Sequence, residues 1–329
     1  MKKTLTVILL LLLALAFAGC APRISLMGDY SDPLKESWVG GKGEDKIAII
    51  PIAGKISEKP RGLLSTSPSL LEETVAALNV AREDKSVKAV ILKLDSPGGE
   101  VTASDVLYHE VKRFRKESGK PVLALLGDQA TSGAYYIAVA ADAIVAHPTT
   151  VTGSIGVIFI TGNLSGLMEK IGVEAKILKT GKYKDILIPT RRMTEDEEKL
   201  FQAILDSMHE RFVTRVIEGR PMMAPERIRE LANGMAYTAD QALKEKLIDK
   251  IGFIEDAVAE TGRLAKLGPD PRLVVYRRAE RANDTVYNAK VSGGPGALNL
   301  LDLGGLDALS MLNQAGFYYL WQPATTDAP

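Results

Sequence analysis

The sequence predicts an α/β fold in which parallel strands alternate with crossover helices. Short apolar runs of strand length alternate along the chain with stretches whose apolar residues recur at helical spacing. Strands that are separated by helices pair in parallel and are buried on both faces, which explains why these runs are almost continuously apolar. With 329 residues, 46% of them hydrophobic, the chain is long enough to bury a sizeable core.

The first expected elements lie in the N-terminal half. Ile47 to Ile52 is a β-branched run of buried-strand length. A helix follows that opens on a capping box, with Ser69 as the N-cap and Glu72 three positions later. The remaining elements of this half are strands over 89–94 and 122–126 and, between them, a helix that ends near Gly119.

The expected elements continue to residue 276. A second capping box, Thr194 with Glu197, opens a long helix. The apolar residues on one face of this helix are Phe201, Ile204, Met208 and Phe212. The other elements are a helix over 132–141, strands near 143–146, 155–160 and 174–178, a helical region over about 225–266, and a strand over 273–276.

Composition excludes several classes of function. The 41 basic and 41 acidic side chains give a net charge of zero, whereas nucleic-acid binding requires a basic surplus. A single cysteine, Cys20, allows neither an intramolecular disulfide nor a cysteine-based zinc site. Only three histidines are present, His109, His147 and His209, and no glycine-rich nucleotide loop occurs. We therefore expect no metal, no nucleotide cofactor and no nucleic-acid partner.

The N-terminus has the pattern of an export signal. Lys2 and Lys3 precede an uncharged, leucine-rich run from Leu5 to Gly19, which is shorter than a typical transmembrane helix. The run ends on Cys20, and this ending resembles a bacterial lipobox, in which the cysteine thiol is diacylated. Two alternatives remain open, namely cleavage after Ala18 by an ordinary signal peptidase and an uncleaved anchor. We expect a membrane-attached protein of the bacterial cell envelope, with its folded domain outside the cytoplasm.

The chain divides into four expected segments. The signal covers residues 1–20, and residues 21–45, rich in glycine, serine, proline and charge, are expected to be a tether. The folded domain covers residues 46–280. Residues 281–329 form a glycine-rich extension whose aromatic end, Phe317 to Trp321, could add an edge strand, dock on a neighbouring molecule or contact a membrane surface.

Two motifs follow expected strand ends and could carry chemistry. In Asp95-Ser-Pro-Gly-Gly99, the glycines can adopt positive φ and leave backbone N–H groups uncovered for an oxyanion, although a simple turn is the alternative. Ser132 begins a helix and is followed by Gly133, whose N–H could face a carbonyl under attack by the serine. For Ser132 the alternative is a serine that only caps the helix.

A nucleophilic serine needs a general base. The three histidines, which lie in expected helices or a turn, have no clear place beside Ser132. Lysine can also act as the base when apolar surroundings favour its neutral form. The candidates are Lys179, Lys182 and Lys184. The apolar run Ile186 to Pro189 favours Lys184, and Lys179 and Lys182 are expected to be solvated, but composition alone leaves the choice among the three open.

Four motifs, in this order along the chain, resemble the signal peptide peptidase SppA family. They are Asp95-Ser-Pro-Gly-Gly99, Ser132-Gly-Ala-Tyr-Tyr136, Thr152-Gly-Ser-Ile-Gly-Val157 and Gly181-Lys-Tyr-Lys184. The segments 234–242 and 247–252 extend the resemblance, which covers about residues 46 to 280. The single copy resembles the short, one-domain form of the family.

This resemblance implies a Clp-protease/crotonase-like fold and a serine endopeptidase with a Ser-Lys dyad. Ser132 matches the nucleophile and Lys184 the general base. Gly99 matches an oxyanion donor, with Gly133 as the second. We expect Ser154 to orient the Lys184 amine, and the alternative is that its hydroxyl satisfies a buried backbone group.

The resemblance also implies partners. The substrates would be apolar peptides such as signal-peptide remnants, beside a membrane, and the protein would form a ring of eight subunits. The dyad could then form within one chain or across a subunit boundary. Two other functions remain open: a crotonase-type acyl-thioester enzyme, which has no use for Ser132 with Lys184, and a non-catalytic envelope lipoprotein that only binds peptides.

Overall fold

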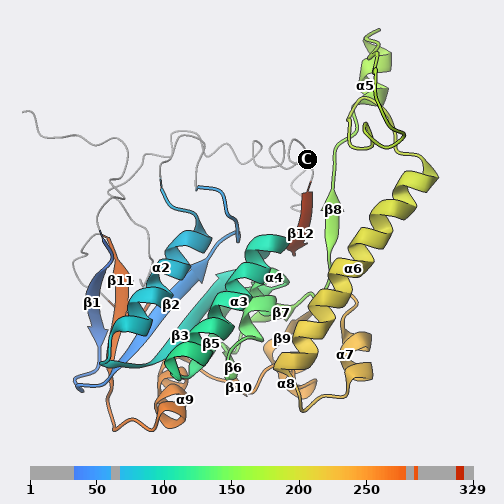
Figure 1. Cartoon of the computed structure of the whole chain (residues 1–329). Helices are drawn as coiled ribbons and strands as arrows, with labels where there is room; N and C mark the ends of the chain where they lie inside the picture. Colours follow the sequence, from blue (N-terminus) through green and yellow to red (C-terminus); the bar gives the residue numbers. More distant parts are fainter. Residues whose placement is uncertain (1–32, 61–66, 279–284, 288–315, 322–329) are drawn as a thin grey trace, which may run out of the picture.

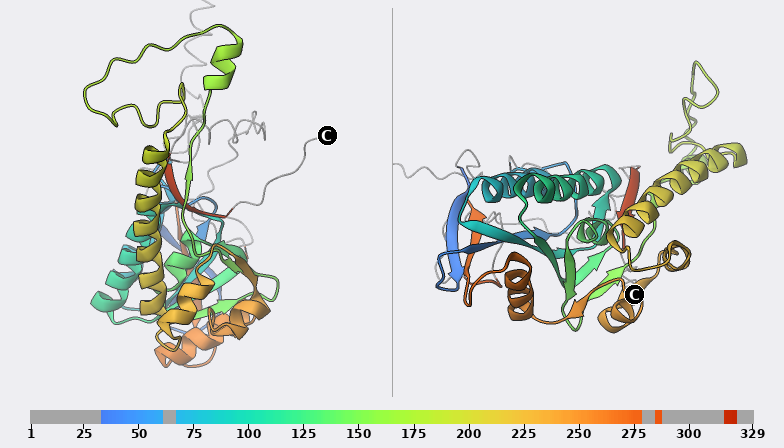
Figure 2. Two further views of the ribbon diagram at one scale, coloured as in Figure 1. Left: turned by 90° about the vertical axis from the view of Figure 1, so that its right-hand side faces the viewer. Right: turned by 60° about the horizontal axis from the view of Figure 1, so that its bottom comes forward.

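The computed structural model describes residues 33–60, 67–278, 285–287 and 316–321. These residues form a layered α/β body with a small second sheet and a projecting arm (Figures 1 and 2). The predicted α/β class, with parallel strands and crossover helices, is confirmed. The predicted signal segment and Cys20 lie outside the described residues.

A nine-stranded sheet forms the centre of the described structure. Its strands are β1 (Lys35–Gly40), β2 (Lys46–Ala53), β3 (Val87–Ser96), β5 (Val122–Thr131), β6 (Ala143–Ala146), β7 (Val151–Gly153), β9 (Ala236–Thr238), β10 (Lys250–Ile251) and β11 (Arg272–Arg277). The order is β1-β11-β2-β3-β5-β6-β10, and β7 pairs with the end of β5 and with β9. Only β1 and β9 pair antiparallel to their neighbours in this sheet.

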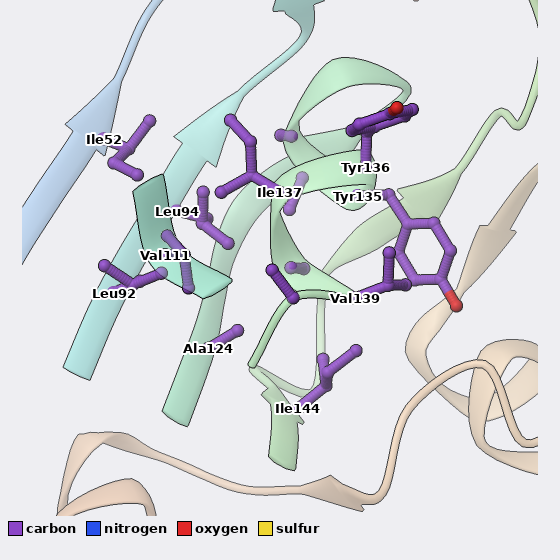
Figure 3. Packing of buried hydrophobic residues seen from close by; sticks show 14 of the residues in the cluster. Ile52, Leu92, Leu94, Val111, Ala124, Tyr135, Tyr136, Ile137, Val139 and Ile144 are labelled. Carbon is purple, nitrogen blue, oxygen red and sulfur yellow. The ribbon is translucent and has the colours of Figure 1, made fainter. Parts of the chain in front are cut away.

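Helices cover both faces of this sheet. The described helices are α2 (Leu70–Glu83), α3 (Val101–Ser118), α4 (Gly133–Ala138), α5 (Ser165–Lys170), α6 (Glu195–Gly219), α7 (Pro225–Leu231), α8 (Ala239–Lys244) and α9 (Ile254–Ala265), of which α5 lies in the projecting arm and not on the sheet. Successive residues of β3 point to opposite faces, so Leu92 joins the core under α3 and Ile91 joins the core under α9. Figure 3 shows Leu92 and Leu94 packed beside Val111 of α3 and Ile137 of α4. Burial on both faces accounts for the unbroken apolar runs.

Both predicted capping boxes are present. The Ser69 hydroxyl accepts from the Glu72 N–H, and the Glu72 carboxylate accepts from the Ser69 N–H, at the start of α2. Thr194 and Glu197 make the same reciprocal pair at the start of α6. Gly119 ends α3 with φ at 66°, a left-handed conformation that glycine adopts at low cost.

Two sequence predictions differ from the structure. Part of the predicted tether is folded. Its strand β1 pairs with β11, so the folded body begins before Lys46. The predicted strand over 174–178 is wrong, since this segment lies exposed between α5 and α6 and pairs with no described strand. Apolar alternation alone does not make a strand where no neighbouring strand is available.

The arm is the segment 161–194, which includes α5 and ends where α6 begins. Figures 1 and 2 show that the arm and the first half of α6 stand clear of the body. Of the four residues predicted on one face of α6, only Phe212 is buried against the body, and Ile204 is 40% exposed. The predicted helix is present, but its apolar face is only partly covered in the single chain, since Phe201 and Met208 are half-buried and Ile204 is exposed.

A second sheet of three short antiparallel strands lies beside the body. It consists of β4 (Gly98–Glu100), β12 (Gly316–Leu320) and β8 (Ile158–Ile160), with β12 in the middle. The aromatic C-terminal segment therefore adds a strand, but as the middle strand of the small sheet and not as the edge strand that the sequence suggested. Among the helices that the structure describes, none is both long enough and apolar enough to cross a bilayer.

Candidate active site

Ser132 lies at the junction between β5 and α4, in a strained conformation. Its φ is 53° and its ψ is −114°, values that residues other than glycine rarely adopt. Its N–H donates to the Gly153 carbonyl at 2.7 Å, and its carbonyl accepts from the Tyr136 N–H at 2.9 Å. Such strain persists only where the surroundings enforce it, and it clusters at active sites, as in the sharp strand-to-helix turns that expose nucleophilic serines.

The Ser132 hydroxyl does not cap the helix that it precedes. No hydrogen bond joins the side chain to the first turn of α4, and the residue is 1% exposed. The alternative of a purely structural N-cap serine is therefore wrong. The hydroxyl remains available for another role.

Ser154 follows the neighbouring strand at the same edge of the sheet. β7 pairs with β5 in parallel, and Gly153 is in register with Thr131, so Ser132 and Ser154 both come directly after the ends of adjacent strands. Ser154 also has a positive φ, at 50°, and its N–H donates to the Met235 carbonyl at 2.8 Å. The sheet thus brings the two serine backbones side by side.

The Pro-Gly-Gly turn packs directly against the start of α4. A Cβ built on Gly98, whose φ is +95°, would lie 2.7 Å from the Gly133 nitrogen. A Cβ on Gly99 would lie 1.9 Å from the Ile56 carbonyl oxygen, and a Cβ on Gly133 would lie 2.4 Å from the Ser104 hydroxyl. Side chains are excluded at all three positions, so backbone approaches backbone beside Ser132. This close approach gives the glycines a packing role that a simple turn does not require.

The strand β12 seats a peptide carbonyl at these glycines. Tyr319 is in register with Gly99, and the Trp321 N–H donates to the Pro97 carbonyl at 2.9 Å. Hydrogen-bonded pairs recur at every second residue of an antiparallel ladder, so Tyr319 and Gly99 are the next such pair. The Tyr319 carbonyl oxygen lies 2.1 Å from the Cβ position of Gly98 and 3.2 Å from that of Gly133.

Two aromatic pockets hold alternate side chains of β12. The fully buried Tyr319 ring stacks on Tyr136 at 5.1 Å and contacts Phe212 at 4.8 Å between ring centroids. The Tyr319 hydroxyl donates to the Met208 carbonyl at 2.9 Å, which satisfies it inside the pocket. Phe317, two residues earlier and on the same face of β12, packs with a second aromatic pair, Phe159 and Phe201.

A charged network supports the first pocket from behind. The Tyr136 hydroxyl donates to Asp105 at 2.6 Å, and Arg211 makes two hydrogen bonds to the same carboxylate. Burial opposes the charge on Asp105, but hydrogen bonds from Arg211 and Tyr136 outweigh it and lower the pKa of the carboxyl. Burial and the hydrogen bond to Asp105 raise the pKa of Tyr136, so its hydroxyl remains a donor.

The single chain does not bring Lys184 to Ser132. Lys184 is exposed in the arm, between α5 and α6, while Ser132 is buried at the start of α4 in the body (Figure 1). Lys179 and Lys182, both predicted to be solvated, are exposed, and Lys179 also pairs with Asp185 at 2.5 Å.

The histidines have other partners. His147 bonds Thr149 and packs on Phe253, and His209 faces the Ala232 carbonyl. Across the described part of the chain, no three His, Cys, Asp or Glu side chains are grouped to hold a metal ion.

Sequence reasoning missed the residues that shape the groove around β12. Ile56 bonds the Pro-Gly-Gly turn from one side, donating its N–H to Gly98 and accepting from the Glu100 N–H, both at 2.9 Å. This leaves the N–H and carbonyl of Gly99 facing β12. The only sequence signal was the aromatic run Phe317 to Trp321, which does not say which strands it pairs with.

A site that seats a peptide carbonyl beside a strained serine is suited to peptide hydrolysis, which is the chemistry of a serine peptidase. The model of Peptidase family S49 matches residues 114–268, and the chain belongs to this family. The resemblance found from the four motifs is thereby confirmed.

Three relatives illustrate the relationship. A putative protease of Synechocystis sp. is 37% identical over 225 residues, which are 68% of this chain and 76% of the relative. A putative signal peptide peptidase SppA of Enterococcus faecium is 34% identical over 76% of this chain and 71% of its own length. A putative protease of Methanocaldococcus jannaschii is 33% identical over 84% of this chain and 87% of its own length. The protein is a serine protease.

Proposed function

We propose that the protein is an exported, membrane-attached endopeptidase that cuts apolar peptides with a dyad of Ser132 and Lys184. The observation that carries this proposal is the position of β12, an extended segment that pairs with β4 on one side and β8 on the other. A substrate strand in the same place would gain main-chain hydrogen bonds on both edges, which is the usual way in which a sheet edge captures a peptide. Its carbonyl would lie beside Ser132.

The mechanism uses one proton carrier. Neutral Lys184 takes the proton from the Ser132 hydroxyl, and the serine oxygen attacks the scissile carbonyl. The N–H groups of Gly99 and Gly133 stabilise the oxyanion, while Ser154 orients the Lys184 amine. Protonated Lys184 then gives its proton to the leaving amine. Water, activated by the same lysine, hydrolyses the acyl-enzyme, and no metal or nucleotide takes part.

The two aromatic pockets support apolar substrates. The Tyr319 carbonyl lies at the glycines, so the Tyr319 side chain marks the pocket for the residue before the scissile bond. Burying an apolar side chain there contributes roughly 1.5–3 kcal/mol. The Enterococcus faecium relative is named as a putative signal peptide peptidase, and the apolar cores of signal peptides have the required chemistry.

We propose further that Lys184 reaches Ser132 from a neighbouring subunit in a ring of eight. The arm that carries Lys184 stands clear of its own body and exposes apolar side chains, each at least half exposed, at Leu164, Leu167, Ile171, Val173 and Leu178. Exposed apolar clusters of this kind mark protein interfaces. A neighbouring body would cover the arm and exclude water from the amine.

Cleavage of apolar peptides tests the proposal. The full chain in detergent should cut a synthetic signal peptide within its apolar core, and mass spectrometry should find the new ends after aromatic or large apolar residues. A peptide of equal length with acidic residues in place of the apolar core should remain intact, because neither aromatic pocket accepts a charge. Absence of cleavage by the assembled wild-type protein, or equal cleavage by Ser132→Ala, would reject the endopeptidase.

The attachment is tested at Cys20. Changing Cys20→Ser should leave an unprocessed precursor and prevent incorporation of labelled fatty acid, because acylation requires the thiol. Electrophoretic mobility and metabolic labelling measure both effects. A mature chain that begins at Gly19 in both the variant and the wild type would show an ordinary signal-peptidase site instead. We propose the cell envelope as the location, with the catalytic domain outside the cytoplasm.

A further inference from the structure

The arm is held together by charge rather than by an apolar core. Over residues 161–200, only Asp185 and Glu197 are buried, at 4% exposure each. Many large apolar side chains of the same stretch are exposed, and Leu178 is 87% exposed. Buried carboxylates are costly unless each is paired, so their partners determine the shape of the arm.

Arg191 joins the two buried carboxylates with four of its five N–H groups, and the fifth donates to a backbone carbonyl. Its Nε donates to Asp185 Oδ2 at 2.8 Å, and its Nη2 donates to Asp185 Oδ1 at 3.0 Å and to Glu197 Oε1 at 2.6 Å. Its Nη1 donates to Glu197 Oε2 at 2.8 Å and to the Arg192 carbonyl at 2.9 Å. Two forked contacts from one planar guanidinium leave little rotational freedom on either side.

The cluster connects the neighbour of Lys184 to the start of α6. Asp185 follows Lys184 in the chain and also accepts from the Lys179 amine at 2.5 Å. Glu197 accepts from the Thr194 N–H in the capping box of α6, and the far half of that helix is anchored in the core by Phe212. The alternating charges of Lys179, Asp185, Arg191 and Glu197 sum to zero, so the Asp185 charge is already paired.

We infer that Asp185, Arg191 and Glu197 are positioning residues. They fix the backbone beside Lys184 and thereby the direction in which the Lys184 side chain projects from the arm. This inference rests on the proposed role of Lys184 as the base. Among the described residues, no hydrogen bond or ion pair holds the Lys184 side chain. Its orientation therefore depends on the backbone conformation at Lys184. A lysine that must reach another subunit loses less conformational freedom when this backbone is already fixed.

The cluster also keeps its charge in acid. Hydrogen bonds from Arg191 and Lys179 hold the pKa of Asp185 far below its usual range, and Arg191 with the Thr194 N–H lowers the pKa of Glu197. Groups with lowered pKa stabilise the fold above their unfolded values, about 4, and lose that effect only as the pH falls through the lowered values. At neutral pH the cluster is therefore fully ionised.

Three substitutions test the inference in the assembled full chain. Asp185→Asn removes one charge, Glu197→Gln keeps the capping box while weakening the contact to Arg191, and Arg191→Lys keeps the charge while losing the fork. Each should lower kcat roughly 10- to 100-fold, the scale expected for a misplaced catalytic group, with KM within about twofold of wild type. The matched control is Asp196→Asn, because Asp196 is 67% exposed and its contact to Lys182 is long, at 3.6 Å.

Mixed assemblies separate positioning from a general loss of structure. Subunits with Ser132→Ala supply the lysine and subunits with Lys184→Ala supply the serine. Adding Asp185→Asn to the first subunit should remove the activity of the mixture, whereas adding it to the second should not. Equal losses in both arrangements, or a kcat for Asp185→Asn equal to that of Asp196→Asn, would overturn the inference. If the unmodified mixture is inactive, the cross-subunit dyad fails, and the kcat of the single variants still decides the positioning role.

Discussion

Ser132→Ala and Lys184→Ala are each expected to abolish peptide cleavage, with a loss of roughly 10³-fold or more, while the fold stays intact. Removing the Ser132 hydroxyl takes away the nucleophile without leaving a large cavity, and Lys184 lies exposed in the arm, so the thermal midpoint should change little. Peptide turnover by mass spectrometry and thermal unfolding by circular dichroism measure the two quantities.

Lys182→Ala is the matched control for the base. Lys182 lies two residues away, carries the same charge and is exposed, so its loss should leave substantial activity. An inactive Lys182→Ala protein together with an active Lys184→Ala protein would show that the base was assigned to the wrong lysine. A Ser132→Ala protein that still cleaves would remove Ser132 from the chemistry.

Mixing the two inactive proteins is expected to restore cleavage. If Lys184 acts on the Ser132 of a neighbouring subunit, random co-assembly in equal amounts pairs an intact serine with an intact lysine at about a quarter of the subunit boundaries of a cyclic ring. Recovery should therefore approach a quarter of the wild-type rate, starting from two preparations with almost none. The two subunits carry different tags, so that mixed rings are purified before the assay.

Two results would contradict a dyad that forms across subunits. Mixed rings that co-purify with both tags and remain inactive would place the dyad within one chain. A protein that is monomeric at working concentration would contradict the cross-subunit arrangement directly, and sedimentation measures this state.

Local patterns in the sequence predicted the elements whose structure is set locally. The capping boxes at Ser69 and Thr194 form as expected because their partners lie three residues away. The strand at Ile47 is recognisable because a parallel strand covered on both faces must be apolar throughout. The motif around Ser132 was also recognisable from local sequence, because its strand, serine and glycine are consecutive in the chain.

Contacts between segments that are distant in the chain could not be predicted from the sequence. Nothing in the run Phe317 to Trp321 specifies pairing with Gly99, more than two hundred residues earlier. The partly covered face of α6 has the same periodicity as a fully covered one, because periodicity does not tell whether the partner is the same chain or another. The ion cluster around Arg191 was also missed, although its four charges recur at every sixth residue from Lys179 to Glu197.

If substrates bind as proposed, the position of β12 makes the protein a competitor of its own substrates. A segment of the same chain is present at its binding groove at an effective concentration on the order of millimolar, whatever the dilution of the protein. A substrate must displace β12 before it can bind. The apparent dissociation constant of the substrate is therefore its intrinsic dissociation constant divided by the fraction of molecules in which β12 has left the groove. On the proposed function, we expect peptides that match the aromatic residues of β12 to win this competition and short or polar segments to lose it. Selectivity then arises from occupancy of the groove as well as from the shape of its pockets.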